Sequence, residues 1–551
     1  MTNRRRGRVL LGTLASLAML AAACGGGGDS ADSNERNGGD AGGGDPVYGG
    51  ELVYGMEAES SGGWCLAESQ LAISGIQVAR AIYDTLTVPN EDGEFVGMLA
   101  ESVEPNEDFT QWTINLREGV TFHDGTALNS SVVKNNIDAW RGQYPARTPL
   151  LLIFAYAPIT DVSVTDDLTL SVTTDVSWPA FPSYLYYTGR VGIMAQAQLD
   201  DPDSCDANLI GTGPFMLEDW QVNDFLSTTR NPDYWATDDA GNQLPYLDAV
   251  TFRPFPEGSA RTNALLGSEL NAMHTSSAQQ VETLEAEADA GNLRLYQSIE
   301  FPEVSYGMLN TAKPPFDNLL AREAAALAFN REQVNEIINL DKFEIANGPF
   351  GPGEMGYLDD TGWPAYDQAA AEELAEQYAA ETGNPLEFTL TVPNTSEVLA
   401  TAQLLQEQGE AVGVTINVEA VEQATLITKA IGGDYEAIAF RNHAGGDPDQ
   451  QYIWWYGGGL TNFGKFDDPE INSLLDEGRS STDQARRTEI YEDLNRRFAT
   501  EYYNLWLNWT EWTIATDPDV YGLAGPDNPD GSGPFPGLAD GHSLAGTWIA
   551  Q

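Results

Sequence analysis

The sequence has few of the residues on which metal sites and nucleophilic catalysis depend. Only three cysteines and four histidines occur in 551 residues, and no HExxH or HxxxH pattern is present. Neither a Gly-x-Ser-x-Gly motif nor a glycine-rich phosphate loop ending in Lys-Ser or Lys-Thr is found. These absences argue against an enzyme, and no metal or other cofactor is expected.

Basic residues are also scarce. The chain has 27 Lys and Arg against 83 Asp and Glu, for a formal net charge of −56. Such a surface repels nucleic acid and anionic lipid, so a nucleic-acid partner is excluded. No repeat of fixed period is seen, which argues against solenoids and propellers. The 42% of hydrophobic residues suffices for two or three cores.

The N-terminus has the pattern of an export signal. Arg4, Arg5, Arg6 and Arg8 precede an apolar run from 9 to 23 that is too short for a membrane span. Small residues end this run, as at a signal-peptide cleavage site. Because Cys24 follows them directly, the segment resembles a bacterial lipoprotein signal, in which this cysteine is lipidated. A plain secretion signal with a chance cysteine is the alternative.

The signal sets the expected location of the chain. We predict a signal peptide over 1–23 and a flexible linker over 24–46, which is rich in Gly, Asp, Ser and Asn. The body should be anchored by lipid on the extracytoplasmic face of the cell membrane. In that oxidising compartment, Cys65 and Cys205 remain as one pair and are predicted to form a disulfide. A metal site is disfavoured, because neither has another Cys or His at ligand spacing.

Short β-rich runs alternate with amphipathic helices. Residues 386–392 predict a strand, a helix follows from about 396, and 414–418 predict a second strand. A helix is also predicted over 369–380, with Asp367 as its cap. This alternation favours α/β lobes.

Four groups of residues occur in an order typical of one family. They are LAES (99–102) with WTINLREGVTFHDGT (112–126); GTGPF (211–215), RNPDYW (230–235) and PYLD (245–248); LNT (309–311) through PFD (315–317) to 322–331; and FDDPEIN (466–472) with LL (474–475). Their order and spacing resemble the extracellular solute-binding proteins of peptide-type ABC importers, the dipeptide/oligopeptide/nickel-binding family 5. The resemblance covers about residues 49–522.

The resemblance implies an α/β fold of the periplasmic-binding-protein type, with two lobes, a hinge of two chain crossings and an extra α+β subdomain on the first lobe. Lobe I should comprise 47–87, 205–304 and 500–551, with 88–204 as the inserted subdomain and 305–499 as lobe II. His123 and Gly211 fall in motifs that we interpret as scaffold, a turn and a chain crossing respectively.

The implied function is solute capture without chemistry. The ligand, a peptide or another small polar molecule, binds between the lobes, and closure presents the monomeric receptor to ABC permease subunits. An oligosaccharide receptor of the same fold is one alternative. A surface sensor or adhesin that does not transport is another.

The resemblance also implies a ligand-binding loop over 440–449. In peptide-binding relatives an aspartate of this loop pairs with the ligand's α-amine, and the matching position here is Ala444. Arg441, Asn442 and His443 offer a cation and amphoteric groups instead, so ligands that lack a bare α-amine should be favoured. Asp447 or Asp449 could replace the missing carboxylate.

Aromatic residues are the other candidates for ligand contact. Trp64 follows the first strand, and Trp454 and Trp455 follow the predicted loop. Aromatic side chains near a cleft can stack on sugars or apolar groups. Packing of these residues in the lobe cores is the alternative.

Anchoring should depend on one sulfur atom. The Cys24→Ser variant should fold normally but be released from the membrane, or should keep an unprocessed signal. Membrane fractionation and the mass of the mature N-terminus measure this. A variant that stays attached and normally processed would contradict the lipoprotein prediction.

Overall fold

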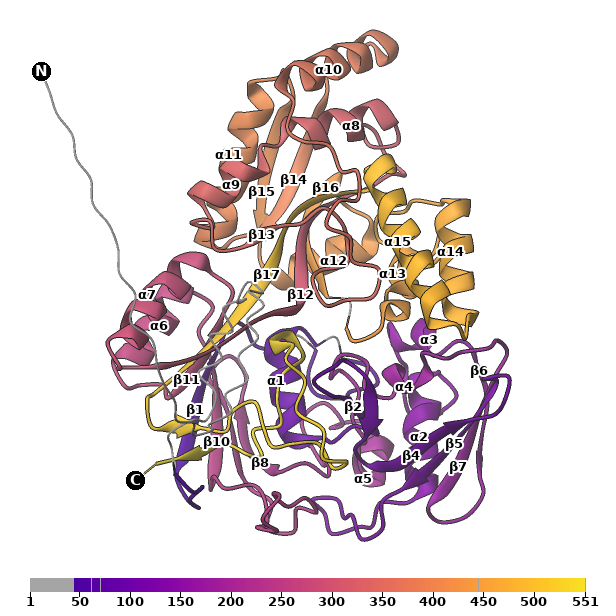
Figure 1. The fold of residues 1–551 in the computed structure, drawn as a ribbon, viewed down its shortest axis with the longest axis vertical. Helices are drawn as coiled ribbons and strands as arrows, with labels where there is room; N and C mark the ends of the chain where they lie inside the picture. The colour runs from indigo at the N-terminus through magenta and orange to yellow at the C-terminus, as the bar shows by residue number, and fades with distance from the viewer. Residues whose placement is uncertain (1–43, 61, 70, 444, 551) are drawn as a thin grey trace, which may run out of the picture. The chain divides into compact units, whose positions relative to one another are not determined.

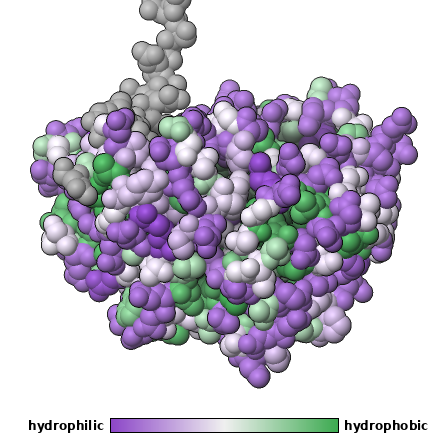
Figure 2. Space-filling model, turned by 90° about the horizontal axis from the view of Figure 1, so that it is seen from below, coloured by the Kyte–Doolittle hydropathy of each residue, from purple (hydrophilic) through white to green (hydrophobic). Residues whose placement is uncertain are grey.

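The computed structural model describes residues 44–60, 62–69, 71–443 and 445–550. The predicted signal peptide, Cys24 and most of the predicted linker lie outside these residues. Within them, no helix is long and apolar enough to cross a membrane. The face seen in Figure 2 is mostly hydrophilic, with apolar residues in scattered groups.

The principal sheet has 11 strands of mixed direction (Figure 1). Its order is β15 (Thr415–Val421), β14 (Glu387–Pro393), β16 (Ala437–His443), β12 (Arg294–Leu309), β17 (Asn504–Thr516), β11 (Ala272–Thr275), β1 (Glu51–Met56), β10 (Ala249–Pro254), β9 (Phe225–Arg230) and β8 (Phe215–Gln221), with β13 (Glu344–Ile345) paired to β17.

Two long antiparallel strands, β12 and β17, connect the two ends of this sheet. Their pairing is interrupted between Ser298 and Glu303, where the register shifts. On one side of the interruption β17 also pairs with β11, and on the other side β12 also pairs with β16. Two chain crossings at the middle of the sheet are what the resemblance implied.

The β-α-β unit predicted after residue 386 is confirmed. Strands β14 and β15 are parallel and are connected by α11 (Ser396–Glu410). The predicted alanine-rich helix is α10 (Gln368–Thr382), and the Asp367 carboxylate accepts a hydrogen bond from the Ala370 N–H at 3.0 Å. It ends at Gly383, whose φ of 78° is favourable only for glycine. These local signals depend on neighbouring residues, which explains why the sequence pattern was sufficient.

The other helices lie between and around the strands (Figure 1). They are α1 (Ile73–Ile82), α2 (Ser130–Trp140), α3 (Leu152–Ala155), α4 (Phe181–Tyr184), α5 (Gln196–Asp200), α6 (Gly258–Leu266), α7 (Ala278–Asp289), α8 (Leu319–Ala328), α9 (Arg331–Ile337), α12 (Gln423–Gly432), α13 (Tyr452–Trp455), α14 (Pro469–Ser480), α15 (Gln484–Glu501), and the 3-10 turns η1 (Pro448–Gln451) and η2 (Leu538–Asp540).

A separate four-stranded antiparallel sheet lies within the predicted inserted subdomain. Its order is β4 (Ala100–Pro105), β5 (Gln111–Leu116), β7 (Thr169–Thr174) and β6 (Ile159–Val164). Two small sheets complete the fold, β2 (Thr87–Pro89) with β3 (Phe95–Gly97), and β18 (Val520–Tyr521) with β19 (Trp548–Ile549).

The buried apolar residues form several cores. The largest contains residues of the predicted lobe I and of the inserted subdomain, with Ile453 as a member from the predicted lobe II. Two further cores consist entirely of residues between Val304 and Trp509. The cores therefore divide near the crossing strands, while the exact domain boundaries remain a prediction.

His123 and Gly211 have structural positions. The His123 Nε2 lies 3.0 Å from the carbonyl oxygen of Gly213, and the Gly211 N–H donates to Nδ1 at 3.3 Å. A Cβ on Gly211 would lie 2.0 Å from the carbonyl oxygen of Ile82, so only glycine fits there. The His123 ring thus connects its own turn to the 211–213 segment, where that segment packs closely against the backbone of Ile82.

Cys65 and Cys205 are bonded in the structure, with Cα atoms 5.0 Å apart and a sequence separation of 140. The bond connects Cys65, in the loop between β1 and α1, to Cys205, which directly follows the predicted inserted region. It therefore closes a loop that contains the whole four-stranded sheet.

Loss of this disulfide should lower stability. In the chain-entropy model a closed loop of this length contributes about 5 kcal/mol, and measured losses are usually smaller. Denaturant unfolding of the oxidised protein and of the Cys65→Ala/Cys205→Ala variant measures the difference. Two alkylatable thiols in the non-reduced protein, or equal unfolding midpoints, would refute the expectation.

Candidate functional site

The end of β16 places the predicted ligand loop beside the crossing strands. In the register with β12, Arg441 is opposite Ser305, Asn442 is opposite Val304 and His443 is opposite Glu303. Because alternate side chains of a strand point to opposite faces, the Arg441 and Asn442 side chains face opposite sides of the sheet. His443, the last residue of β16, therefore lies opposite Glu303, where the β12–β17 pairing resumes after its interruption.

Arg441 connects segments that are far apart in the sequence. Its guanidinium donates to Glu57 Oε1 at 3.0 Å and to Ser276 Oγ at 3.3 Å, and it lies 3.6 Å from Glu303 Oε2. It also lies over the Trp512 ring, 5.4 Å from the centroid. Its side chain is 37% exposed. Two carboxylates therefore already face Arg441 within the protein, and its predicted contact with ligand remains a prediction.

The charges around Arg441 alter the titration of its neighbours. Burial raises the pKa of the Glu57 carboxyl, but the charges of Arg441 and Arg261 oppose this, and the net pKa lies below its ordinary value. Burial lowers the pKa of His274 to about 3, so this ring is neutral at physiological pH. Its Nε2 accepts the Glu57 backbone N–H at 3.2 Å.

A third carboxylate belongs to the same group. Burial raises the pKa of Glu397, at the start of α11, although a hydrogen bond with Ser277 opposes the shift. Glu57 and Ser277 belong to the predicted lobe I, whereas Arg441 and Glu397 belong to the predicted lobe II. Side chains of both lobes therefore meet in one charged cluster.

The other residues of the predicted loop are only partly described. The Asn442 side-chain amide donates to Gln451 Oε1, which ties the strand end to η1. For His443 the backbone is described and the side chain is not, and Ala444 lies outside the described residues. Their predicted ligand contacts therefore remain predictions.

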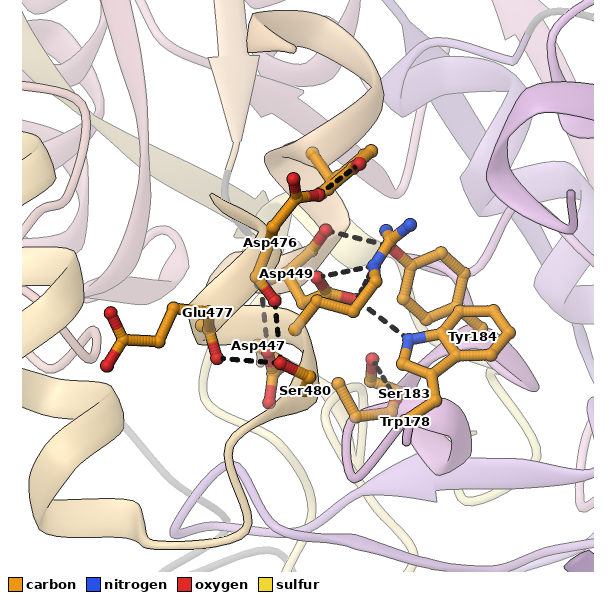
Figure 3. A network of polar contacts seen from close by, with 12 residues as sticks. Trp178, Ser183, Tyr184, Asp447, Asp449, Asp476, Glu477 and Ser480 are labelled. Carbon is orange, nitrogen blue, oxygen red and sulfur yellow. Dashed lines mark hydrogen bonds and ion pairs between the residues drawn. The ribbon is translucent and has the colours of Figure 1, made fainter. Parts of the chain in front are cut away.

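Asp447 and Asp449 have partners within the protein. The Asp447 carboxylate accepts hydrogen bonds from Arg487 at 2.7 and 3.0 Å. Asp449, which is fully buried, accepts from Arg479 Nε at 2.9 and 3.2 Å and from Trp178 Nε1 at 2.8 Å (Figure 3). Both carboxylates are therefore already paired with arginines, which disfavours the alternative that either one replaces the carboxylate missing at position 444.

The aromatic candidates lie mainly in cores. Trp64 is 0% exposed and packs edge-on against Trp220, and Trp455 is 4% exposed against Phe350 and Phe498. Core packing therefore replaces the predicted ligand contact at both positions. Trp454 is partly buried and packs against Phe463 at 5.6 Å.

Sequence reasoning missed Glu57, Glu303 and Glu397 as members of the charged cluster. Glu57 directly follows β1, and a polar residue at a strand end is a signal that could have identified it. Glu303 is inside β12 and Glu397 is in the first turn of a helix, so nothing local marked either. Among the described residues, no group of three or more His, Cys, Asp and Glu is placed to hold a metal ion.

The comparisons with known proteins agree on one family. The sequence model described as "Bacterial extracellular solute-binding proteins, family 5 Middle" matches residues 94–463. The glutathione-binding protein GsiB of Pectobacterium atrosepticum is 27% identical over 433 residues, which cover 76% of this chain and 80% of that protein.

Solved structures resemble the fold over nearly its whole length. The binding protein AgaA of A. tumefaciens R10, in complex with agropinic acid, gives a TM-score of 0.80 at 25% identity, covering 91% of this chain and 99% of that chain. The oligopeptide-binding protein AppA of Bacillus subtilis, in complex with a nonapeptide, gives 0.79 at 21% identity, covering 92% and 100%. The predicted α/β periplasmic-binding-protein fold is confirmed.

The Arg441–Glu57 pair should give stability that depends on pH. Because the folded-state pKa of Glu57 is lowered, its charged form stabilises the fold above the unfolded value of about 4.3. This contribution is lost as the pH falls through the folded-state pKa. Glu57→Gln should cost about 0.5–1 kcal/mol at pH 7, in keeping with a partly exposed pair, and progressively less as the pH falls below the unfolded value.

Denaturant unfolding of both proteins between pH 3 and pH 7 measures this difference. Glu269→Gln is the matched control, because Glu269 pairs with Arg253 on the surface at 2.7 Å. A Glu57→Gln penalty that stays constant across the range would disprove the role given to the charged carboxylate.

Proposed function

The chain belongs to family 5 of the bacterial extracellular solute-binding proteins, and we propose that it is the lipid-anchored receptor through which an ABC importer takes up a peptide-like or other polar organic solute. It is a binding protein and not an enzyme. The observation that supports the proposal best is the cluster around Arg441, in which side chains of both predicted lobes meet beside the crossing strands.

The proposed mechanism is closure about β12 and β17. The register shift between Ser298 and Glu303, with Phe301 at a φ of 50°, is a short irregular segment that can absorb a rotation. A solute that contacts both lobes binds the closed arrangement better than the open one and so shifts the equilibrium towards it. The closed receptor, a monomer on the extracytoplasmic face, then docks on the permease subunits.

The proposed ligand is not held by an aspartate on its α-amine. Ala444 replaces that residue by alignment, and Asp447 and Asp449 are engaged by Arg487 and Arg479. An ammonium group without a counter-charge is costly to bury. Blocked or cyclic peptides, carboxylated solutes and peptides with an unusual linkage therefore fit the proposal better than simple dipeptides do. Agropinic acid, the ligand named for the structural relative AgaA, is a carboxylated solute of this kind. Glutathione, the ligand named for GsiB, has an unusual peptide linkage but keeps a free α-amine, so it tests the proposal and does not support it.

The alternatives have less support. An oligosaccharide receptor would need exposed aromatic surfaces, and Trp64 and Trp455 are buried in cores. A surface sensor or adhesin would share the same anchor and fold. Permease and ATPase genes beside the gene for this chain would favour import over that alternative.

Ligand identity can be tested by thermal shift and calorimetry. The panel should contain glutathione, N-acetylated and free dipeptides, longer peptides, opine-type acids and oligosaccharides, because a ligand of the native state raises the unfolding temperature. We expect a shift with peptide-like or carboxylated solutes and none with simple dipeptides. Tight binding of free dipeptides would show that the loop alignment is wrong, and binding of oligosaccharides alone would favour the alternative receptor.

Asn442 provides a test within the site. Asn442→Ala removes the donor to Gln451 and any bond to the ligand, so affinity for the ligand found in the panel should fall roughly 5- to 150-fold. His443→Ala should act similarly. The control is Asn417→Ala. Asn417 lies in β15, and its exposed side-chain amide donates to Glu387 of β14 at 2.9 Å. Equal affinities for Asn442→Ala and Asn417→Ala would contradict this role.

A further inference from the structure

The predicted inserted subdomain also contacts the predicted lobe II directly, away from the strands β12 and β17 that cross between the lobes. We call this the Asp449 junction and define it by Trp178, Ser183 and Tyr184 on one side and by Asp449, Gln450 and Arg479 on the other. Figure 3 shows the two sides meeting. No member belongs to β12 or β17, so this contact is separate from the crossing strands.

Four hydrogen bonds cross the junction. Trp178 Nε1 donates to Asp449 Oδ2 at 2.8 Å, and the Tyr184 hydroxyl donates to the Asp449 carbonyl oxygen at 2.7 Å. Arg479 Nη2 donates to the Tyr184 hydroxyl at 2.9 Å, and Gln450 Nε2 donates to the Ser183 carbonyl oxygen at 3.0 Å. Two of these bonds, from Trp178 to the Asp449 carboxylate and from Arg479 to the Tyr184 hydroxyl, are charge-assisted.

The aromatic side of the junction is rigid. Trp178 and Tyr184 are fully buried, and their ring centroids lie 4.5 Å apart. Phe181 packs against Trp178 at 5.5 Å, and Tyr156 packs against Tyr184 at 6.0 Å. The subdomain core therefore holds the indole N–H and the phenol in position for their partners.

The charged side does not need the subdomain for its own neutralisation. Arg479 contacts both oxygens of Asp449 and lies 3.6 Å from the centroid of the Tyr452 ring, and all three residues belong to the predicted lobe II. Separation at the junction would leave this ion pair intact, so no buried charge would lose its partner. Water could replace the four crossing bonds, which makes the contact reversible.

The junction is also linked to the ligand loop. Asp449 donates its backbone N–H to Asp447 at 2.9 Å, and Gln451 in the same turn accepts from Asn442. The position of η1 therefore affects the end of β16, where the predicted ligand contacts begin.

We infer that the inserted subdomain stabilises the closed arrangement through Trp178 and Tyr184. These two act as positioning residues for η1 and for the loop that precedes it, without contact with the solute. The inference rests on the proposed function, since closure matters because a solute is captured. It assigns the subdomain a role in the equilibrium between open and closed receptor.

The test is hydrogen–deuterium exchange of the full-length protein in detergent, without ligand. Trp178→Phe removes the donor to Asp449 and keeps an aromatic ring in the core. Exchange in residues 449–456 and in residues 178–187 should both become about tenfold faster or more, because a charge-assisted hydrogen bond is lost from the closed state. The matched control is Trp140→Phe, since Trp140 is equally buried in the subdomain and its Nε1 has no hydrogen-bond partner among the described residues.

The Tyr184 hydroxyl gives a second pair of variants, should Trp178→Phe not fold. Tyr184→Phe should accelerate exchange in both segments, whereas Tyr54→Phe removes a buried hydroxyl that has no partner among the described residues and should not. Exchange that equals the control, or that accelerates only in 178–187, would overturn the inference. Because no ligand is used, failure of every solute to bind would refute the proposed function and leave this result unaffected.

Discussion

The antiparallel pairing of β12 with β17 is the constraint on which the rest of the structure depends. β12 also pairs with β16 and β17 also pairs with β11, so the two halves of the 11-stranded sheet, and the two groups of cores, are connected through these two strands. A connection of two strands restricts relative motion to bending and twisting, and the interrupted register near Glu303 is the place where backbone bonds resist that motion least. The charged cluster of Arg441 lies at this same place, so the proposed hinge and the proposed ligand site adjoin.

Polar contacts between the predicted lobes occur at two sites with different physics. Around Arg441 the groups are partly exposed, and several carboxylates share one guanidinium, so the contacts can be exchanged for ligand or water at modest cost. At the Asp449 junction the ion pair is buried and complete on one side, and neutral aromatic donors complete the contact from the other. The first arrangement suits recognition of a variable partner, and the second suits a contact of fixed geometry.

The sequence predicted those features that depend on neighbours along the chain or on motifs of the family. The α10 cap at Asp367, the parallel β14–α11–β15 unit and the overall fold were all predictable, because capping, periodicity and motif order are local or inherited signals. The use of each candidate side chain was harder to predict. Asp447 and Asp449 were indistinguishable from free carboxylates in sequence, since their partners Arg487 and Arg479 lie 40 and 30 residues away.

The sequence by itself determined the family, the α/β class, the absence of catalytic constellations and the likeness of the N-terminus to an export signal. Only the tertiary structure decided which charges are already neutralised and which aromatic residues are buried. Trp64 could have faced a ligand or a core, and its position against Trp220 depends on packing between segments more than 150 residues apart. Glu57 and Arg441, separated by 384 residues, meet only because β1 and β16 belong to the same sheet. Pair identity over such separations is set by strand order and packing, and no local pattern encodes it.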